Sequence, residues 1–447
     1  MPHLPERASL EQLRKQAKEL GPPLHAAQRE IARRYGFASW ARLKRHVEAA
    51  VALGRYPDEA AAAGPADTFL RHACLTYGGD NPSRRAVAVP PPEPTVHTAA
   101  ACADVPALRR IVAADPGAAG REGGPYRWPP LLYLTYARHD PAVSLTAVRD
   151  TARLLLDAGA DPNAGYLWHG LVPPFTALTG AFGEGEGGPV NQPRHPHAIP
   201  LARLLLEAGA DPNDAQALYN RQFGADDDHL ELLFGYGLGA GDGGPWRRLF
   251  GDALDGPAEL VRGQLHWAVT HGMAARVRLL VRHGVDVGTP YDDGRTPAAL
   301  AVVTGHPEIV AALGVAAPPL DPVDAFVAAA LAGDAAALDP AGAAAARAAY
   351  PGLVVWAAVA GGAAAVELLV AHGFDVNARG RGDAPRPDPW ETALHQAAAR
   401  DDVDLARVLL RLGADPTIRD ARFDATPLDW ARHLGRPRMA AFLESDR

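Results

Sequence analysis

The chain has 447 residues, a formal net charge of −8 and two cysteines, Cys74 and Cys102. Its length suggests up to three ordinary domains, and two cysteines in unrelated contexts exclude a disulfide framework and a paired-cysteine metal site. The sequence does not begin with a basic segment followed by an apolar core, so we expect a cytoplasmic protein without a secretion signal. Only three of the 44 basic residues are lysine, a bias that suggests a GC-rich bacterial genome.

The first fifty residues predict three short helices. Leucine and alanine recur at helical spacing over residues 10–20, and Ser9 stands at the position of an N-cap. A second helix is expected over residues 24–35, and a third is expected to start at Ser39. We therefore expect a small helical module over residues 1–52.

This module is basic, whereas the rest of the chain is acidic. Residues 1–50 carry ten Lys/Arg and five Asp/Glu, a net +5, which leaves −13 for the remainder. A basic head can bind nucleic acid or dock on the acidic remainder. A solvated helix face is the simpler interpretation, because the segment shows no interleaving of aromatic and basic residues. Residues 53–66, which include Gly54 and Pro65, are interpreted as a linker.

From residue 67 onward, leucine-rich helices end repeatedly in the same way. A glycine follows the leucines and can take the left-handed conformation that closes a helix, and an Asp-Pro or similar pair then starts a turn. Such glycines are Gly159, Gly209, Gly237, Gly284, Gly373 and Gly413. Thinner, alanine-rich helices are expected upstream, starting at Thr296, Thr392 and Thr426. The pattern predicts an all-α array of helix-turn-helix units ending in a helix pair over residues 426–443.

The spacing of these units is irregular. The interval of 89 residues between Gly284 and Gly373 must hold more than one unit. Insertions are expected near residues 183–200 and 239–263, and their glycine and proline content favours loops. The most apolar stretch, Leu353–Val370, is divided by two glycines, so it is expected to form two packed helices and no membrane span.

Several residues recur at fixed offsets and resemble the ankyrin repeat. Thr392-Ala393-Leu394-His395 followed by the leucine-rich helix and Gly413-Ala414-Asp415 matches nearly the whole family pattern, and residues 293–310 match its first half. The resemblance covers residues 67–447 and implies an ankyrin-repeat solenoid of insertion-containing units. The string from Leu4 to Lys18, with the later string from Tyr35 to Lys44, also resembles a short leader that precedes many bacterial ankyrin arrays.

The sequence offers little that indicates catalysis or metal binding. His195 and His197 lie in an expected loop without further ligands, and the acidic run Asp226–Asp228 precedes a helix, where carboxylates favour the N-terminus. Phosphate-binding and nucleophile motifs are missing from the sequence. The resemblance implies structural hydrogen bonds for His97, His266 and His395. We therefore expect no enzyme activity, no cofactor and no metal.

The resemblance implies that the chain is a monomeric scaffold that binds a partner protein through turn fingers, inner helices and inserted loops. Exposed aromatic residues and arginines on the turns are the candidate contacts: Tyr166, Trp168, Tyr291, Arg295, Arg381, Trp390 and Phe423. Packing between neighbouring fingers is the alternative for each of them. Two further alternatives are a nucleic-acid-associated regulator that uses the basic module, and an enzyme with a site in the insertions.

Overall fold

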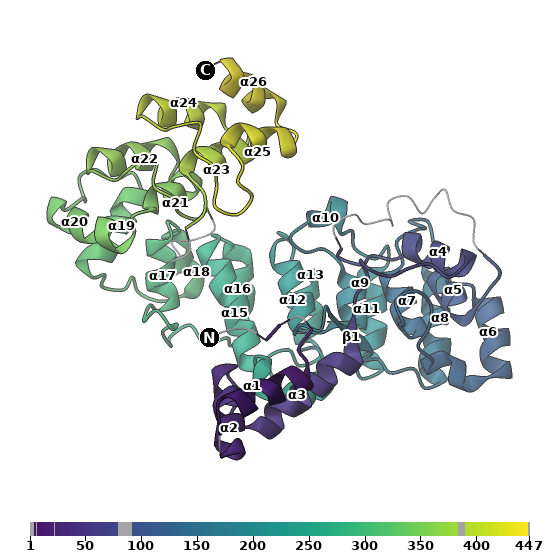
Figure 1. Cartoon of the computed structure of the whole chain (residues 1–447). Helices are drawn as coiled ribbons and strands as arrows, with labels where there is room; N and C mark the ends of the chain where they lie inside the picture. Colours follow the sequence, from purple (N-terminus) through teal and green to yellow (C-terminus); the bar gives the residue numbers. More distant parts are fainter. Residues whose placement is uncertain (1–3, 6, 22, 79–91, 383–388, 446–447) are drawn as a thin grey trace. The chain divides into compact units, whose positions relative to one another are not determined.

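The computed structural model describes residues 4–5, 7–21, 23–78, 92–382 and 389–445, and these residues are predominantly helical with three short strands. They divide into two compact units, residues 1–264 and 265–447, which are described separately below. The predicted all-α fold of helix-turn-helix units is confirmed in both (Figure 1).

The predicted N-terminal helices are present in the first unit. They are α1 (Leu10–Glu19), α2 (Leu24–Arg34) and α3 (Trp40–Leu53). Ser39 caps α3 by accepting a hydrogen bond from the backbone N–H of Arg42 at 3.2 Å, whereas the Ser9 side chain makes no capping hydrogen bond. The three helices share a small apolar core of Leu13, Ala17, Ala27, Ile31, Ala32, Leu43 and Val47.

The rest of the first unit is built from helix pairs that pack in sequence. Its elements are β1 (Gly54–Arg55), α4 (Pro65–Ala73), α5 (Val96–Ala101), α6 (Val105–Ala114), η2 (Pro116–Gly120), α7 (Pro130–Tyr136), α8 (Leu145–Asp157), β2 (Gly165–Trp168), β3 (Phe175–Thr176), α9 (Ala177–Phe182), α10 (Gly188–Asn191), α11 (Ala198–Glu207), α12 (Ala215–Gln222), α13 (Asp228–Phe234), α14 (Gly244–Phe250) and η3 (Gly251–Ala253). The thinner helices α5, α7, α9 and α12 pack on one another, and so do α6, α8, α11 and α13. This two-row stacking is the arrangement that the alternating alanine-rich and leucine-rich helices predict.

The expected linker, residues 53–66, is an ordered part of this unit. Its strand β1 pairs in parallel with β2, and β2 pairs antiparallel with β3, so the finger between α8 and α9 becomes a small three-stranded sheet. Arg55 is buried, and its guanidinium donates to Glu122 Oε1 at 2.7 Å and to the carbonyl oxygen of Ala52 at 2.8 Å. The segment therefore connects the N-terminal helices tightly to the following helix pairs.

The second unit continues the pattern of helix pairs. The boundary between the units falls inside α15 (Pro257–Thr270). The following helices are α16 (Ala274–Arg282), α17 (Pro297–Val303), α18 (Glu308–Leu313), α19 (Pro322–Leu331), α20 (Pro340–Ala349), α21 (Leu353–Ala360), α22 (Gly362–Ala371), α23 (Ala393–Ala399), α24 (Val403–Arg411), α25 (Pro427–His433) and α26 (Pro437–Ser445). Helices α17, α19, α21, α23 and α25 pack consecutively. The long interval before Gly373 thus holds several pairs, and α25 with α26 forms the predicted terminal pair.

The capping glycines have the predicted conformation. The φ angles of Gly159, Gly209, Gly237, Gly284, Gly373 and Gly413 lie between +77° and +99°. The asparagine that follows three of these turns links neighbouring units. Asn377, for example, donates to the carbonyl oxygen of Gly413 at 3.0 Å and accepts from the N–H of Asp415 at 2.8 Å. Asn163 makes the equivalent pair of bonds in the first unit, and Asn213 donates to the carbonyl oxygen of Ala240 and accepts from the N–H of Gly239. The turn sequence thus also fixes how successive fingers align.

The loop interpretation of the two insertions holds only in part: residues 183–187 and 192–197 are non-helical, but both insertions also contain helices. Residues 183–200 contain α10 and the start of α11, and residues 239–263 contain α14, η3 and the start of α15. Glycine and proline are compatible with these helices because Pro245 occupies the first turn of α14, where a missing N–H costs nothing, and Gly243 precedes it with a φ of +79°.

Among the described residues, no single helix is long and apolar enough to cross a membrane. Helices α20 and α21 reach that length only together, and they bend by 107° at their junction. The predicted division of Leu353–Val370 into two helices is confirmed, since α21 ends before Gly361 and α22 follows it. Leu353, Val354 and Leu369 are buried in the core of the second unit, which explains the apolar composition.

Candidate partner-binding surface

The described residues between α22 and α23 form the base of one finger of the second unit. At its base, the N–H of Gly380 donates to the carbonyl oxygen of Glu391 at 2.8 Å, and the N–H of Trp390 donates to the carbonyl oxygen of Gly380 at 3.0 Å. The N–H of Gly382 donates to Glu391 Oε1 at 2.7 Å. Arg381 is half-buried beside these bonds. Part of the predicted extended finger, residues 383–388, lies outside the described residues.

Trp390 stands at the centre of an aromatic cluster between this finger and the next. Its ring centroid lies 5.3 Å from that of Trp430 and 5.8 Å from that of Phe423, and the Arg422 guanidinium lies 5.0 Å from it. Trp390 itself is half-buried, but 70% of Phe423 is exposed. We call Trp390, Arg422, Phe423 and Trp430 the finger cluster. In this cluster, the Trp390 side chain packs against its neighbours and the Phe423 side chain, at the tip of the next finger, is exposed.

A buried carboxylate holds the tip in place. Asp420 accepts hydrogen bonds from the N–H groups of Arg422 at 2.8 Å, Phe423 at 2.6 Å and Ala425 at 3.2 Å, and from the Trp430 indole at 2.9 Å. Burial favours the neutral acid, but the hydrogen bonds from Phe423, Trp430 and the other donors outweigh it and lower the pKa of Asp420. The ionised carboxylate thus fixes the loop that presents Phe423.

Residues 390–421 match the family model of the ankyrin repeat. The matched segment begins at Trp390, contains α23 and α24, and ends in the turn that Asp420 organises. This match supports the resemblance seen in the sequence. Of the finger cluster it includes Trp390, and Arg422 and Phe423 follow immediately after its end. His395 has the structural role that the resemblance implies, because its ring lies 2.8 Å from Thr392 Oγ1 and 3.0 Å from the carbonyl oxygen of Ala425.

Of the predicted contact residues on the other fingers, Tyr166 is wrong. It is buried, with its ring stacked 5.0 Å from Trp128 and 5.6 Å from Phe175, because its position in β2 directs it into the core. Trp168, two residues later in the same strand, is half-buried beside His169, with ring centroids 4.1 Å apart. It pairs with Arg55 of β1, so it forms part of the three-stranded finger.

Tyr291 and Arg295 share the finger between α16 and α17. Tyr291 is half-buried, and its ring lies 4.7 Å from that of His266. Arg295 makes two hydrogen bonds to the Asp324 carboxylate, at 2.5 and 2.8 Å, and one to the Tyr350 hydroxyl at 2.6 Å. The bonds to Asp324 raise the pKa of the Arg295 guanidinium. Arg295 is therefore an internal clamp on α19, and its assignment as a partner contact is corrected.

The acidic run places Asp228 in the first turn of α13, as the sequence predicts, and it also forms ion pairs. Asp227 occupies the N-cap position without a capping hydrogen bond from its side chain. Arg194 pairs with Asp228 at 2.5 Å, and the fully buried Arg221 pairs with Asp226, Asp228 and Glu184. These ion pairs fasten the 183–200 insertion to α12 and α13.

The same network argues against metal binding. Asp226, Asp228 and His229 lie close enough to share an ion, but two guanidinium groups already contact the carboxylates. His195 is buried, its Nδ1 accepts from the N–H of His197 at 3.0 Å, and burial lowers its pKa. His197 lies 2.6 Å from the carbonyl oxygen of Val143. Both histidines are thus held within the fold, where the sequence suggested a flexible loop.

The sequence did not single out Arg422 and Trp430 of the finger cluster, or Asp420, which supports it. A signal was present, because an aspartate that starts a turn commonly accepts hydrogen bonds from the next backbone N–H groups. The position of Trp430 on α25, four residues after the Thr426 cap, also directs its ring toward the finger.

Proposed function

We propose that the protein is a non-enzymatic scaffold that binds a partner protein through its ankyrin-type fingers, inner helices and inserted segments. The observation that carries this proposal is the finger cluster, in which Phe423 is held outward by a buried carboxylate. Ankyrin repeats serve as protein-interaction modules, and the matched repeat begins at Trp390 and ends just before Arg422 and Phe423 of this cluster.

The composition of the cluster suits an interface. Tryptophan and arginine are the residues that most often dominate the binding energy of protein interfaces. Because Asp420 already orders the loop, binding at Phe423 requires little further loss of conformational entropy. Arg381 and Trp390 remain candidate contacts at this surface, and Trp168 and Tyr291 remain candidates on other fingers.

The proposed function also includes the oligomeric state, the location and the role of the N-terminal helices. We propose that the protein acts as a monomer in a bacterial cytoplasm, and that the N-terminal helices form a leader to the array. Neither a cofactor nor a catalytic residue is required for this function, because recognition depends on the displayed surface alone.

The test begins with affinity purification from the native host and identification of the captured proteins by mass spectrometry. The purified partner is then titrated against wild type, Phe423→Ala and Leu434→Ala. Leu434 is a matched control, because 43% of it is exposed at the opposite end of α25 from the finger. We expect Phe423→Ala to weaken binding by ~2 kcal/mol and Leu434→Ala to leave it unchanged. Equal affinities for all three proteins would place the interface elsewhere.

A further inference from the structure

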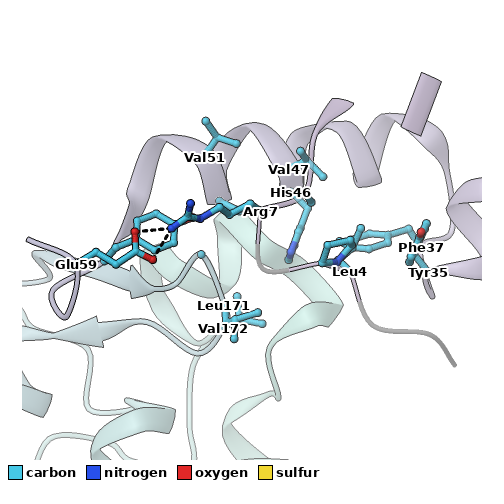
Figure 2. A pocket seen from close by; sticks show the side chains of 15 residues that line it. Leu4, Arg7, Tyr35, Phe37, His46, Val47, Val51, Glu59, Leu171 and Val172 are labelled. Atoms are coloured by element: carbon cyan, nitrogen blue, oxygen red, sulfur yellow. Dashed lines mark hydrogen bonds and ion pairs between the residues drawn. The ribbon is translucent and has the colours of Figure 1, made fainter. Parts of the chain in front are cut away.

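The first unit contains a second concave surface, separate from the finger cluster. Its larger part is a hollow of about 810 Å³ beside α3. Figure 2 shows His46, Val47 and Val51 on one side and Leu171 and Val172 on the other. The wall is more apolar than polar and is open to water, since 70% of Val51 and 41% of Leu171 are exposed. Exposed aliphatic side chains that face each other across a hollow mark a site for an apolar group.

One end of this hollow holds an ion pair. Arg7 donates to both carboxylate oxygens of Glu59, at 2.5 and 2.6 Å, and its guanidinium lies 4.5 Å from the centre of the Tyr56 ring. In Figure 2, Glu59 lies on the side of the hollow away from Tyr35 and Phe37. The paired charges offer little attraction to a further ion, so the electrostatic preference of the surface is set at its other end.

At that other end the hollow continues into a basic one. Tyr35, Phe37 and His46 line both the apolar hollow and a second of about 310 Å³, which is also lined by Arg42, Arg45 and Arg248. Arg42 pairs with Asp252 at 2.7 Å and Arg248 with Asp242 at 2.7 Å. Arg45 is exposed and pairs with no carboxylate among the described residues. The basic hollow therefore carries an uncompensated positive charge.

The His46 side chain, which lines both hollows, is held between two aromatic rings. The His46 ring lies 4.9 Å from Phe37 and 5.2 Å from Phe250 in edge-to-face contacts, which join α3 to α14. Its Nδ1 has no hydrogen-bond partner among the residues that the structure describes. Burial lowers the pKa of His46, so the ring is neutral near pH 7 and adds no positive charge to either hollow.

We propose that this two-part groove binds a short peptide segment of a partner protein, with aliphatic side chains in the apolar hollow and acidic side chains at Arg45. Because Tyr35, Phe37 and His46 line both hollows, an extended peptide can run from one hollow into the other. The net charge of +5 on residues 1–50 attracts an acidic segment and speeds its association. The groove belongs to the first unit, so this second interface does not depend on the finger cluster.

Other occupants fit less well. A nucleic acid would use the arginines but gain nothing from the apolar hollow, because phosphate contacts supply most of its affinity. A fatty acid would leave its chain partly in water, because Val51 and Leu171 stand in the open wall. A peptide satisfies both parts, since its backbone and polar face tolerate the solvent side.

The experiment selects peptides from a random display library against the full-length protein and measures the affinity of the selected peptides by fluorescence anisotropy. The variants are Val51→Asp in the apolar hollow and Arg45→Glu in the basic one. Val190→Asp is the matched control, because 79% of Val190 is exposed on α10. Phe423→Ala separates the groove from the finger cluster.

We expect the selected peptides to combine aliphatic residues with aspartate or glutamate. Val51→Asp should weaken their binding about tenfold or more, the scale of one lost anchor side chain. Arg45→Glu should weaken it and reduce its dependence on salt, while Val190→Asp and Phe423→Ala bind as wild type does.

The proposal is overturned if no peptide is selected or if the selected peptides bind Val51→Asp as tightly as wild type. Two further probes identify a different occupant. Binding of laurate that is lost in Val51→Asp, without peptide binding, would assign the groove to a lipid. Binding of a single-stranded DNA oligonucleotide that is lost in Arg45→Glu but kept in Val51→Asp would assign the basic hollow to nucleic acid.

Discussion

Individual carboxylates in this protein act by organising backbone, and two of them allow direct tests. Asp420 and Asp214 are both buried, yet their surroundings move their pKa values in opposite directions. Asp420 accepts hydrogen bonds from three backbone N–H groups and an indole, which favour the ionised form. Asp214 is more completely desolvated, and burial outweighs its hydrogen bonds to Thr176 and Thr179.

Asp420→Ala should disorder the loop that presents Phe423. The change leaves several donors without an acceptor, so we expect a loss of ~2 kcal/mol in the free energy of unfolding. Urea denaturation followed by tryptophan fluorescence measures it. Asp404→Ala is the control, because the Asp404 side chain is 92% exposed, and it should change little. An Asp420→Ala protein as stable as the control would mean that the turn is held by other contacts.

Asp214 predicts a pH dependence of the first unit. Burial raises its pKa to about 6 from an ordinary value of 3.8, so the folded chain binds more protons than the unfolded chain between these values. The contribution to stability is therefore fully present below pH 3.8 and is lost as pH rises to about 6, by up to ~3 kcal/mol.

The measurement compares urea denaturation of wild type and Asp214→Asn between pH 4 and pH 7. The asparagine cannot ionise, so the stability of wild type should fall relative to that of the variant as pH rises. Parallel pH profiles for the two proteins would show that Asp214 does not titrate in this range.

At the scale of elements, the sequence is informative wherever the determinant is local. The ends of α1 and α2, the start of α3, the capping glycines and the division of Leu353–Val370 were predictable from neighbouring residues. The pairing of β1 with β2 was not, because it joins residues more than a hundred positions apart. The two predicted contacts that failed, Tyr166 and Arg295, did so for the same reason. Each depends on a distant partner, Trp128 or Asp324.

The terminal pair α25 and α26 should be required for solubility. Leu428 and Met439 are buried and cover the preceding pair, whose Leu405 and Leu409 lie in the same core. Truncation after Asp420 should expose these leucines and cause aggregation, because an uncapped repeat array presents an apolar end. Size-exclusion chromatography with light scattering tests this, and a monomeric truncated chain of unchanged melting temperature is the opposing outcome.

At the scale of the molecule, the N-terminal helices have their own core but are joined to the rest of the first unit. Arg42 pairs with Asp252, His46 contacts Phe250, and β1 continues directly from α3. The boundary at residues 52–53 remains a prediction. Cutting the chain there would separate the small core of α1, α2 and α3 from the helix pairs, and it would remove the contacts of Arg42 and His46.

Deletion of residues 1–52 tests that boundary. Because Gly54 and Arg55 remain, we expect the helix pairs to unfold cooperatively, with a melting temperature lowered by ~4 °C or more for the lost contacts. Calorimetry on the full-length and shortened chains measures the difference. A broad, non-cooperative transition would show that the N-terminal helices are an obligatory cap and no separate module.

The most direct test of the central claim is site-specific photo-crosslinking in the native host. A photoreactive phenylalanine analogue replaces Phe423 in one strain and Leu434 in another. Both positions are exposed, but Phe423 lies on the finger and Leu434 at the far end of α25. We expect a discrete protein adduct from position 423 that is missing from position 434. The same adducts from both positions, or none from position 423, would contradict a partner-binding role for the finger cluster.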